Sequence, residues 1–116
     1  MKLIGVCITT DDAPRLATFY EVVFQESPEV DGQHYAFASA QLSVYDPGDV
    51  QVSEHKNMSL MYYVDDVPAE YARLTLALPD MVVDSPPQRR PWGALSFWCL
   101  DPDGNLISFV QREGEP

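Results

Sequence analysis

The sequence predicts an α+β fold in which two βαβββ modules form curved mixed sheets around a cleft. The first observation is a repeat. Asp-Asp-x-Pro occurs at residues 11–14 and again at 65–68, 54 positions later in a chain of 116 residues. Each copy follows a strand-like run and precedes a helical stripe and further strand-like runs, which indicates an internal duplication. The second observation is a C-terminal hairpin. One helix and a few strands cannot bury their apolar faces alone. We therefore expect a single domain, 1–116, whose modules span about 1–56 and 57–116.

In the first half, an apolar run rich in Ile, Val and Thr predicts a strand. An Asp before Pro is typical of a helix start, and apolar residues at i, i+3, i+4 and i+7 then form one helical stripe, which a Ser-Pro pair ends. Two further strands and a short fourth one complete the module. The expected strands are Leu3–Thr10, His34–Ser39, Leu42–Tyr45 and Val50–Val52, and the stripe is Leu16, Phe19, Tyr20 and Val23.

The second half repeats this plan. A strand with aromatic character precedes the second helix, Pro79 ends that helix, and a short strand, a Pro-rich loop and the hairpin follow. Asp101-Pro102-Asp103-Gly104-Asn105 has the turn chemistry of a tight hairpin loop. The expected strands are Ser59–Val64, Met81–Val83, Ala94–Leu100 and Leu106–Val110, the stripe is Tyr71, Leu74 and Leu78, and the loop is Asp84–Arg90.

Composition excludes several function classes. The formal net charge of −11 disfavours nucleic-acid binding; it favours a cationic ligand or simply keeps the protein soluble. No apolar run approaches the roughly 20 residues that span a bilayer, so we expect no membrane partner. The first residues lack the long apolar segment of a signal peptide. Cys7 and Cys99 lie in apolar runs and are expected to be buried free thiols, and we expect a cytoplasmic protein.

These elements together resemble the vicinal oxygen chelate superfamily, which groups glyoxalase I, bleomycin-resistance proteins and extradiol dioxygenases. The resemblance covers nearly the whole chain. It rests on Asp12 with Phe19-Tyr20, on Tyr63-Val64-Asp65-Asp66-Val67, and on Asp101–Asn105 followed by Leu106-Ile107. Each motif is weak alone, but their order and spacing within a repeated βαβββ plan are fairly specific for the fold.

The resemblance implies a divalent metal held by four strand side chains, typically His, Glu or Gln. In this sequence the corresponding positions are Gly5, Ser43, Ser59 and Ser108, although the second could slide to Gln41 or Tyr45. Gly has no side-chain donor and a neutral Ser hydroxyl is a poor ligand for such ions. We therefore expect no metal, no cofactor and no catalytic residue of the family's kind.

Other candidate residues have simpler interpretations. His34 and His55 are expected to be solvated, with Glu54-His55 the better substitute ligand. Arg89-Arg90 could grip an anion but is expected to be exposed. The Asp pairs at 11–12 and 65–66 are expected to cap helices. No nucleophile elbow or Gly-rich phosphate loop is present.

Strand alternation from these metal positions predicts most of the lining of the cleft. The resemblance adds Trp98, which stands at the family's cleft-facing position three residues before the Asp-Pro, with Ser96 on the same face. This lining is aromatic, thioether and hydroxyl, which suits a planar or apolar ligand, but the same residues could instead fill a core. The predicted lining residues are Cys7, Thr9, Gln41, Ser43, Tyr45, Ser59, Met61, Tyr63, Ser96, Trp98 and Ser108.

The favoured hypothesis is a metal-free protein that binds a small aromatic or cationic compound. The alternatives are a metal-dependent lyase or dioxygenase with non-standard ligands, and a regulatory or structural module with a closed cleft. Val22, Phe24 and Leu76 widen the helical stripes, and uncovered strand edges favour pairing, so we also expect a homodimer. The cleft could then be built within one chain or from both.

Overall fold

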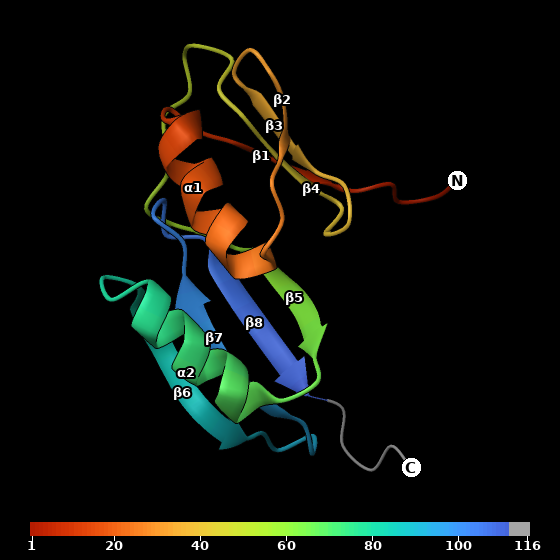
Figure 1. The fold of residues 1–116 in the computed structure, drawn as a ribbon, viewed down its shortest axis with the longest axis vertical. Helices are drawn as coiled ribbons and strands as arrows, with labels where there is room; N and C mark the ends of the chain where they lie inside the picture. Colours follow the sequence, from red (N-terminus) through yellow and green to blue (C-terminus); the bar gives the residue numbers. More distant parts are fainter. Residues whose placement is uncertain (112–116) are drawn as a thin grey trace. The chain divides into compact units, whose positions relative to one another are not determined.

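The computed structural model describes residues 1–111 and divides the chain into two compact units, Met1–Ser53 and a second that begins at Glu54. Each unit contains one helix and a four-stranded mixed sheet in the order β-α-β-β-β (Figure 1). The α+β fold of two βαβββ modules is therefore confirmed. That the modules form one domain around a cleft, with a boundary near residue 56, stays a prediction.

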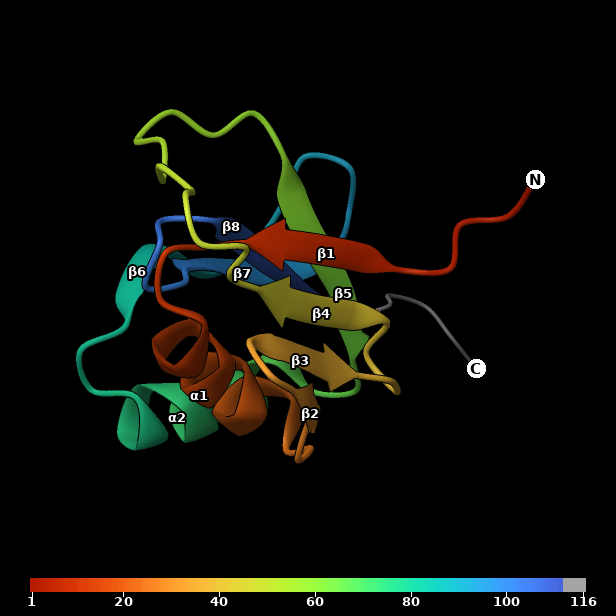
Figure 2. The same ribbon diagram turned by 90° about the horizontal axis from the view of Figure 1, so that it is seen from above.

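The first module has the strand order β1-β4-β3-β2, with β1 parallel to β4 and the other pairs antiparallel. Helix α1 lies along its own sheet (Figure 2). The fourth strand is β2, not the expected Val50–Val52, which lies outside any strand. Exposed β2 has no alternating pattern to reveal it. The elements are β1 (Val6–Thr9), α1 (Ala13–Phe24), β2 (Glu29–Asp31), β3 (His34–Phe37) and β4 (Leu42–Tyr45).

The second module repeats this connectivity with the strand order β5-β8-β7-β6. Its one clear departure from expectation is β6, which runs through the stretch expected to be a Pro-rich loop. Strand β6 is an edge strand and its register shifts twice, so Pro86 and Pro87 are tolerated there. The elements are β5 (Ser59–Val64), α2 (Val67–Ala77), β6 (Val82–Arg89), β7 (Leu95–Leu100) and β8 (Leu106–Gln111).

Both helices begin as the repeated motif predicts. The Asp12 carboxylate accepts a hydrogen bond from the Arg15 amide at 3.2 Å, and the Asp66 carboxylate accepts one from the Ala69 amide at 3.0 Å. A proline follows each cap within the first turn, where its missing N–H costs no helical hydrogen bond. The second Asp of each pair is thus a helix cap, as expected.

Each helix buries one face of its own sheet. In the second module, Tyr71 of α2 packs edge-on against Phe97 at 5.2 Å, and Phe97 stacks on Phe109 at 4.8 Å. In the first module, Phe24 of α1 meets Phe37 at 5.5 Å. Since strand residues alternate between faces, the remaining positions project to the side away from the helix.

The β7–β8 loop is held by one buried carboxylate. Asp101 accepts hydrogen bonds from the Asp103 amide at 2.9 Å, the Asn105 amide at 2.8 Å and the Asn105 side-chain amide at 2.8 Å. Gly104 has a φ of +85°, which favours glycine. The loop therefore fixes the register in which β7 meets β8.

We predict that Asp101→Ala lowers the free energy of unfolding by about 2 kcal/mol or more, because three donors lose a charged acceptor. Urea denaturation followed by circular dichroism measures this change. Asp84→Ala, an exposed carboxylate on β6, is the matched control and should shift stability by about 0.5 kcal/mol or less. Equal losses in the two variants would contradict the role given to Asp101.

Candidate functional site

The sheet of the second module brings its predicted site residues to one face. Register pairs Met61 with Ser108, and Ser108 with Trp98; it also pairs Val110 with both Tyr63 and Ser96. Phe97 and Phe109, which lie on the side of the sheet that α2 covers, occupy the alternate positions. The second-module residues on the face opposite α2 thus include Ser59, Met61, Tyr63, Ser96, Trp98 and Ser108. We call this surface the open face.

Arg90 joins the open face and is buried, with 8% of its surface exposed. The expectation that it is exposed was wrong. Its Nε donates to Ser96 Oγ at 2.7 Å, Nη1 donates to Ser85 Oγ at 3.1 Å, and Nη2 donates to the Ser96 carbonyl at 3.2 Å. Its guanidinium carbon lies 4.0 Å from the centre of the Trp98 ring. Trp98 therefore supports the arginine while the serines fix its orientation.

Within residues 1–111, Arg90 is a cation without an ion-pair partner. No carboxylate within residues 1–111 forms an ion pair with it; the protein atoms that accept its hydrogen bonds are serine oxygens and the Ala94 carbonyl. The guanidinium group of an arginine is a cation. The open face thus carries a positive charge in a fixed position, although the protein as a whole is strongly acidic.

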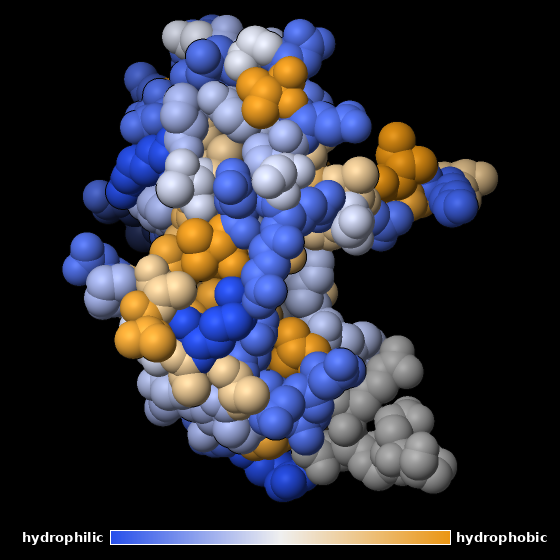
Figure 3. Space-filling model, viewed as in Figure 1, coloured by the Kyte–Doolittle hydropathy of each residue, from blue (hydrophilic) through white to orange (hydrophobic). Residues whose placement is uncertain are grey.

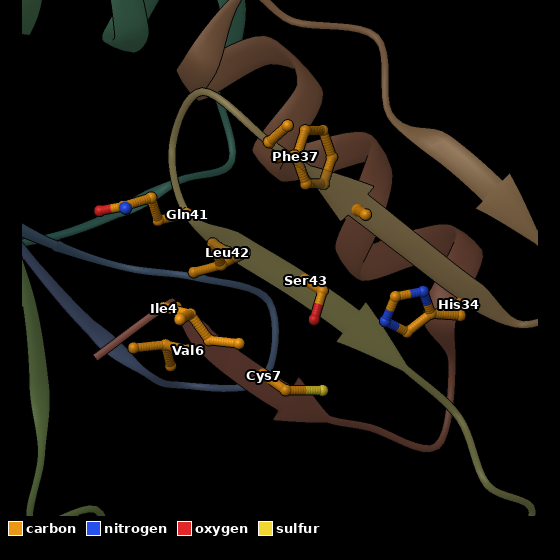
Figure 4. A pocket seen from close by; sticks show the side chains of 11 residues that line it. Ile4, Val6, Cys7, His34, Phe37, Gln41, Leu42 and Ser43 are labelled. Atoms are coloured by element: carbon orange, nitrogen blue, oxygen red, sulfur yellow. The ribbon is translucent and has the colours of Figure 1, made fainter. Parts of the chain in front are cut away.

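The first module contains a pocket of about 470 Å³ on the face of its sheet (Figure 4). Cys7, Ser43 and His34 come from the adjacent strands β1, β4 and β3, and their side chains lie next to one another there. Predicted residues Cys7, Gln41 and Ser43 line this pocket together with Gly5. Register places Thr9 beside Tyr45 on the same face, further along the strands.

Two expectations about these side chains were wrong. His34 is half-buried and lines the pocket instead of being solvated, whereas His55 is exposed as expected. Cys7 is exposed, because it lies on the strand face away from α1; Cys99 is buried as expected. Burial and the nearby Asp101 raise the pKa of the Cys99 thiol to about 12, so it is a poor nucleophile.

The residues at the former metal positions do not fit a divalent metal. A Cβ on Gly5 would lie 2.9 Å from the Gln41 carbonyl oxygen, which accepts a hydrogen bond from the Val6 amide at 2.9 Å. A side chain at residue 5 would therefore require this backbone to shift. Ser43, Ser59 and Ser108 offer only neutral hydroxyls. Nowhere in the described part of the chain do three or more His, Cys, Asp or Glu side chains form a group that could hold a metal ion.

Comparison with protein families now identifies the fold. The model of the Glyoxalase/Bleomycin resistance protein/Dioxygenase superfamily matches residues 2–109. The chain belongs to this superfamily. No curated protein matches the sequence.

Membrane-spanning helices are a separate question. Neither helix within residues 1–111 has the length and the apolar character needed to cross a membrane.

Solved structures show the same fold at low sequence identity. A protein of unknown function from Agrobacterium tumefaciens is 20% identical, with a TM-score of 0.81 over 97% of this chain and 94% of that one. A glyoxalase-related enzyme from Fulvimarina pelagi is 21% identical, with a TM-score of 0.75 over 100% and 92%. TioX from Micromonospora sp. ML1 is 19% identical, with a TM-score of 0.72 over 92% and 96%. At such identities the likeness concerns the fold.

The predicted lining omits Arg90, although the pair Arg89-Arg90 was a candidate for binding an anion. The stretch that precedes it contains Pro86 and Pro87 and two register shifts, so no alternation links Arg90 to Trp98. The neighbouring Arg89 is exposed, which fits the expectation for the pair. The two arginines differ in their hydrogen-bond partners: Arg89 donates to the Gly93 carbonyl in the β6–β7 loop, whereas Arg90 donates to Ser85 and Ser96, and local sequence does not encode this difference.

We predict that Gly5→Ala destabilises the protein by about 1–3 kcal/mol, because the added methyl group overlaps a backbone oxygen that is already hydrogen-bonded. Chemical denaturation measures the change. Lys2→Ala, at an exposed position of the same N-terminal segment, is the control and should change stability by about 0.5 kcal/mol or less. An alanine at residue 5 that leaves stability unchanged would show that this position tolerates a side chain.

Proposed function

We propose that this member of the superfamily is a metal-free protein that binds a small aromatic compound on the open face, and that it acts by sequestering the compound without chemical change. The observation that supports this most is Arg90 stacked on Trp98, on a sheet face where the family's metal positions have become serines. The proposed compartment is the cytoplasm, since both cysteines are free thiols.

The open face offers apolar contact beside directional polar groups. Met61 and Tyr63 are 69% and 65% exposed, so this face presents two large side chains with apolar surface. Aromatic rings and a thioether adapt well to a planar ligand. Ser96 and Ser108 are buried beside them. An aromatic ring could therefore rest on the exposed side chains while a polar substituent reaches the buried groups.

Charge separates the two ligand types that the sequence left open. The net charge of −11 attracts cations over long distances. Close to the open face, however, the fixed charge of Arg90 repels them. The proposed ligand is therefore aromatic, and a positive charge on it is not required.

The two tryptophans allow a direct test. Trp98 belongs to the open face, whereas Trp92 is exposed in the β6–β7 loop. We predict that a panel of neutral and charged naphthalene compounds changes the fluorescence of Trp92→Phe, which retains Trp98, at micromolar to millimolar concentrations. The matched control Trp98→Phe should respond weakly. No response of the Trp98 reporter across the panel would remove the support for this function.

The alternative, a metal-dependent lyase or dioxygenase, finds one favourable observation: His34 and Cys7, both possible metal ligands, line the same pocket. We nevertheless predict that protein supplied with Ni, Zn, Fe and Mn holds less than stoichiometric metal. Elemental analysis after buffer exchange measures this. A stoichiometric ion that His34→Ala removes, and that the control His55→Ala retains, would favour the alternative.

A homodimer forms part of the proposal. Leu76 on α2 is 85% exposed, and Leu3 and Ile4 in the N-terminal segment are 79% and 84% exposed; Figure 3 shows apolar surface on this protruding segment. Strands β1 and β5 are also edge strands of their sheets. A two-fold contact could cover such a surface with one patch.

We predict a mass near 26 kDa, twice the 13.0 kDa of one chain, in sedimentation equilibrium at micromolar concentration. Leu76→Glu places a charge on the exposed α2 position, and Asp80→Ala serves as a control at another exposed position. A monomer across the whole concentration range would contradict the dimer. A dimer that persists in Leu76→Glu would show that the interface does not include this position of α2.

A further inference from the structure

We infer that the ligand of the open face is an aromatic carboxylate, whose negative charge pairs with Arg90. This inference rests on the proposed function and adds the charge and the polar group of the ligand. The hydrogen bonds of the Arg90 side chain leave part of its donor capacity unused. Three guanidinium nitrogens donate to Ser96 Oγ, Ser85 Oγ and the Ser96 carbonyl.

A guanidinium has five N–H groups, one on Nε and two on each Nη. Each of its nitrogens makes one of these three hydrogen bonds, so one N–H on Nη1 and one on Nη2 have no acceptor among residues 1–111. A carboxylate can accept hydrogen bonds from Nη1 and Nη2 with its two oxygens. The side chain is thus oriented by protein oxygens while part of its donor capacity remains available.

The buried environment of Arg90 also favours binding of an anion. Removing a cation from water is costly unless an opposite charge or further hydrogen bonds compensate. Serine hydroxyls, one carbonyl and the Trp98 ring supply partial compensation, but all are neutral. A ligand carboxylate would supply the missing negative charge where water is largely excluded, since Arg90 is only 8% exposed.

The same surroundings favour a small aromatic monoanion over a polyanion. A net charge of −11 repels nucleic acids and multiply charged phosphates more strongly than it repels one carboxylate. A flat carboxylate matches the planar guanidinium. An aromatic ring attached to it could then extend over Trp98, Tyr63 or Met61, which share the open face.

Isothermal titration calorimetry with three naphthalene compounds of one shape tests the inference. The probes are 2-naphthoate, neutral 2-naphthamide and cationic 2-naphthylmethylammonium. We expect the wild-type protein to bind the carboxylate at least about tenfold more tightly than the amide, because a charged hydrogen-bonded pair is worth more than a neutral one. We expect the ammonium compound to bind most weakly.

Variants then assign the selectivity to one side chain. Arg90→Gln should reduce the preference for the carboxylate to near unity, and Arg90→Lys, which keeps the charge but not the fork, should reduce it partly. Arg89→Gln is the matched control: it changes the net charge equally at the adjacent, exposed position and should retain the preference. Circular dichroism checks that each variant is folded.

The possible failures have different consequences. If the amide or ammonium compound binds the wild type as tightly as the carboxylate, the inference is wrong while the proposed aromatic binding function stands. If Arg89→Gln loses as much selectivity as Arg90→Gln, general charge explains the effect and the inference is again wrong. If none of the three compounds binds, both the inference and the proposed function lose their support. The relative affinities of the three compounds for the wild-type protein test the inference even if Arg90→Gln does not fold.

Discussion

The constraint on which the structure depends is that each module has one helix for a sheet with two faces. Helix α2 buries Phe97 and Phe109 on its side of the second sheet, and α1 does the same for Phe37 in the first. Strand alternation sends the intervening residues to the opposite side. The repeated Asp-capped helix start therefore determines, twice in one chain, which side chains pack against the helix and which project from the opposite face of the sheet. Both the open face and the first-module pocket follow from this division.

On that available side, this chain differs from the metal chemistry that its superfamily resemblance implies. A Cβ at Gly5 would lie 2.9 Å from the Gln41 carbonyl oxygen, so the packing of β1 disfavours a side-chain ligand there. Ser108 pairs with Trp98 and with Met61, and Arg90 is stacked on Trp98. A cationic guanidinium on the face that carries two of the former metal positions suits an anionic ligand and would repel a metal ion. The function that we propose therefore relies on stacking and hydrogen bonding and not on metal coordination.

The sequence predicted most of the fold because its signals are local and repeated. Strands β4 and β5 have the expected bounds, both capping Asp residues act as expected, and alternation correctly grouped Met61, Tyr63 and Trp98 on one face. Strand β2 was missed because its three residues are all exposed, and β6 because edge position and register shifts allow prolines that normally indicate a loop. Arg90 and His34 could not be assigned to their surroundings, since both depend on contacts made through the sheet and not on neighbours in sequence.

The central claim is that the open face of the second module is the ligand surface. The most direct measurement is a two-dimensional ¹⁵N–¹H spectrum of the protein with increasing 2-naphthoate, because each tryptophan gives a separate indole N–H signal. We predict that the Trp98 signal and the amide signals of β5, β7 and β8 change their chemical shifts and saturate together. The Trp92 signal and the amide signals of α2 should change little. Saturable shifts centred on α2 or on Trp92, with Trp98 unchanged, would contradict it.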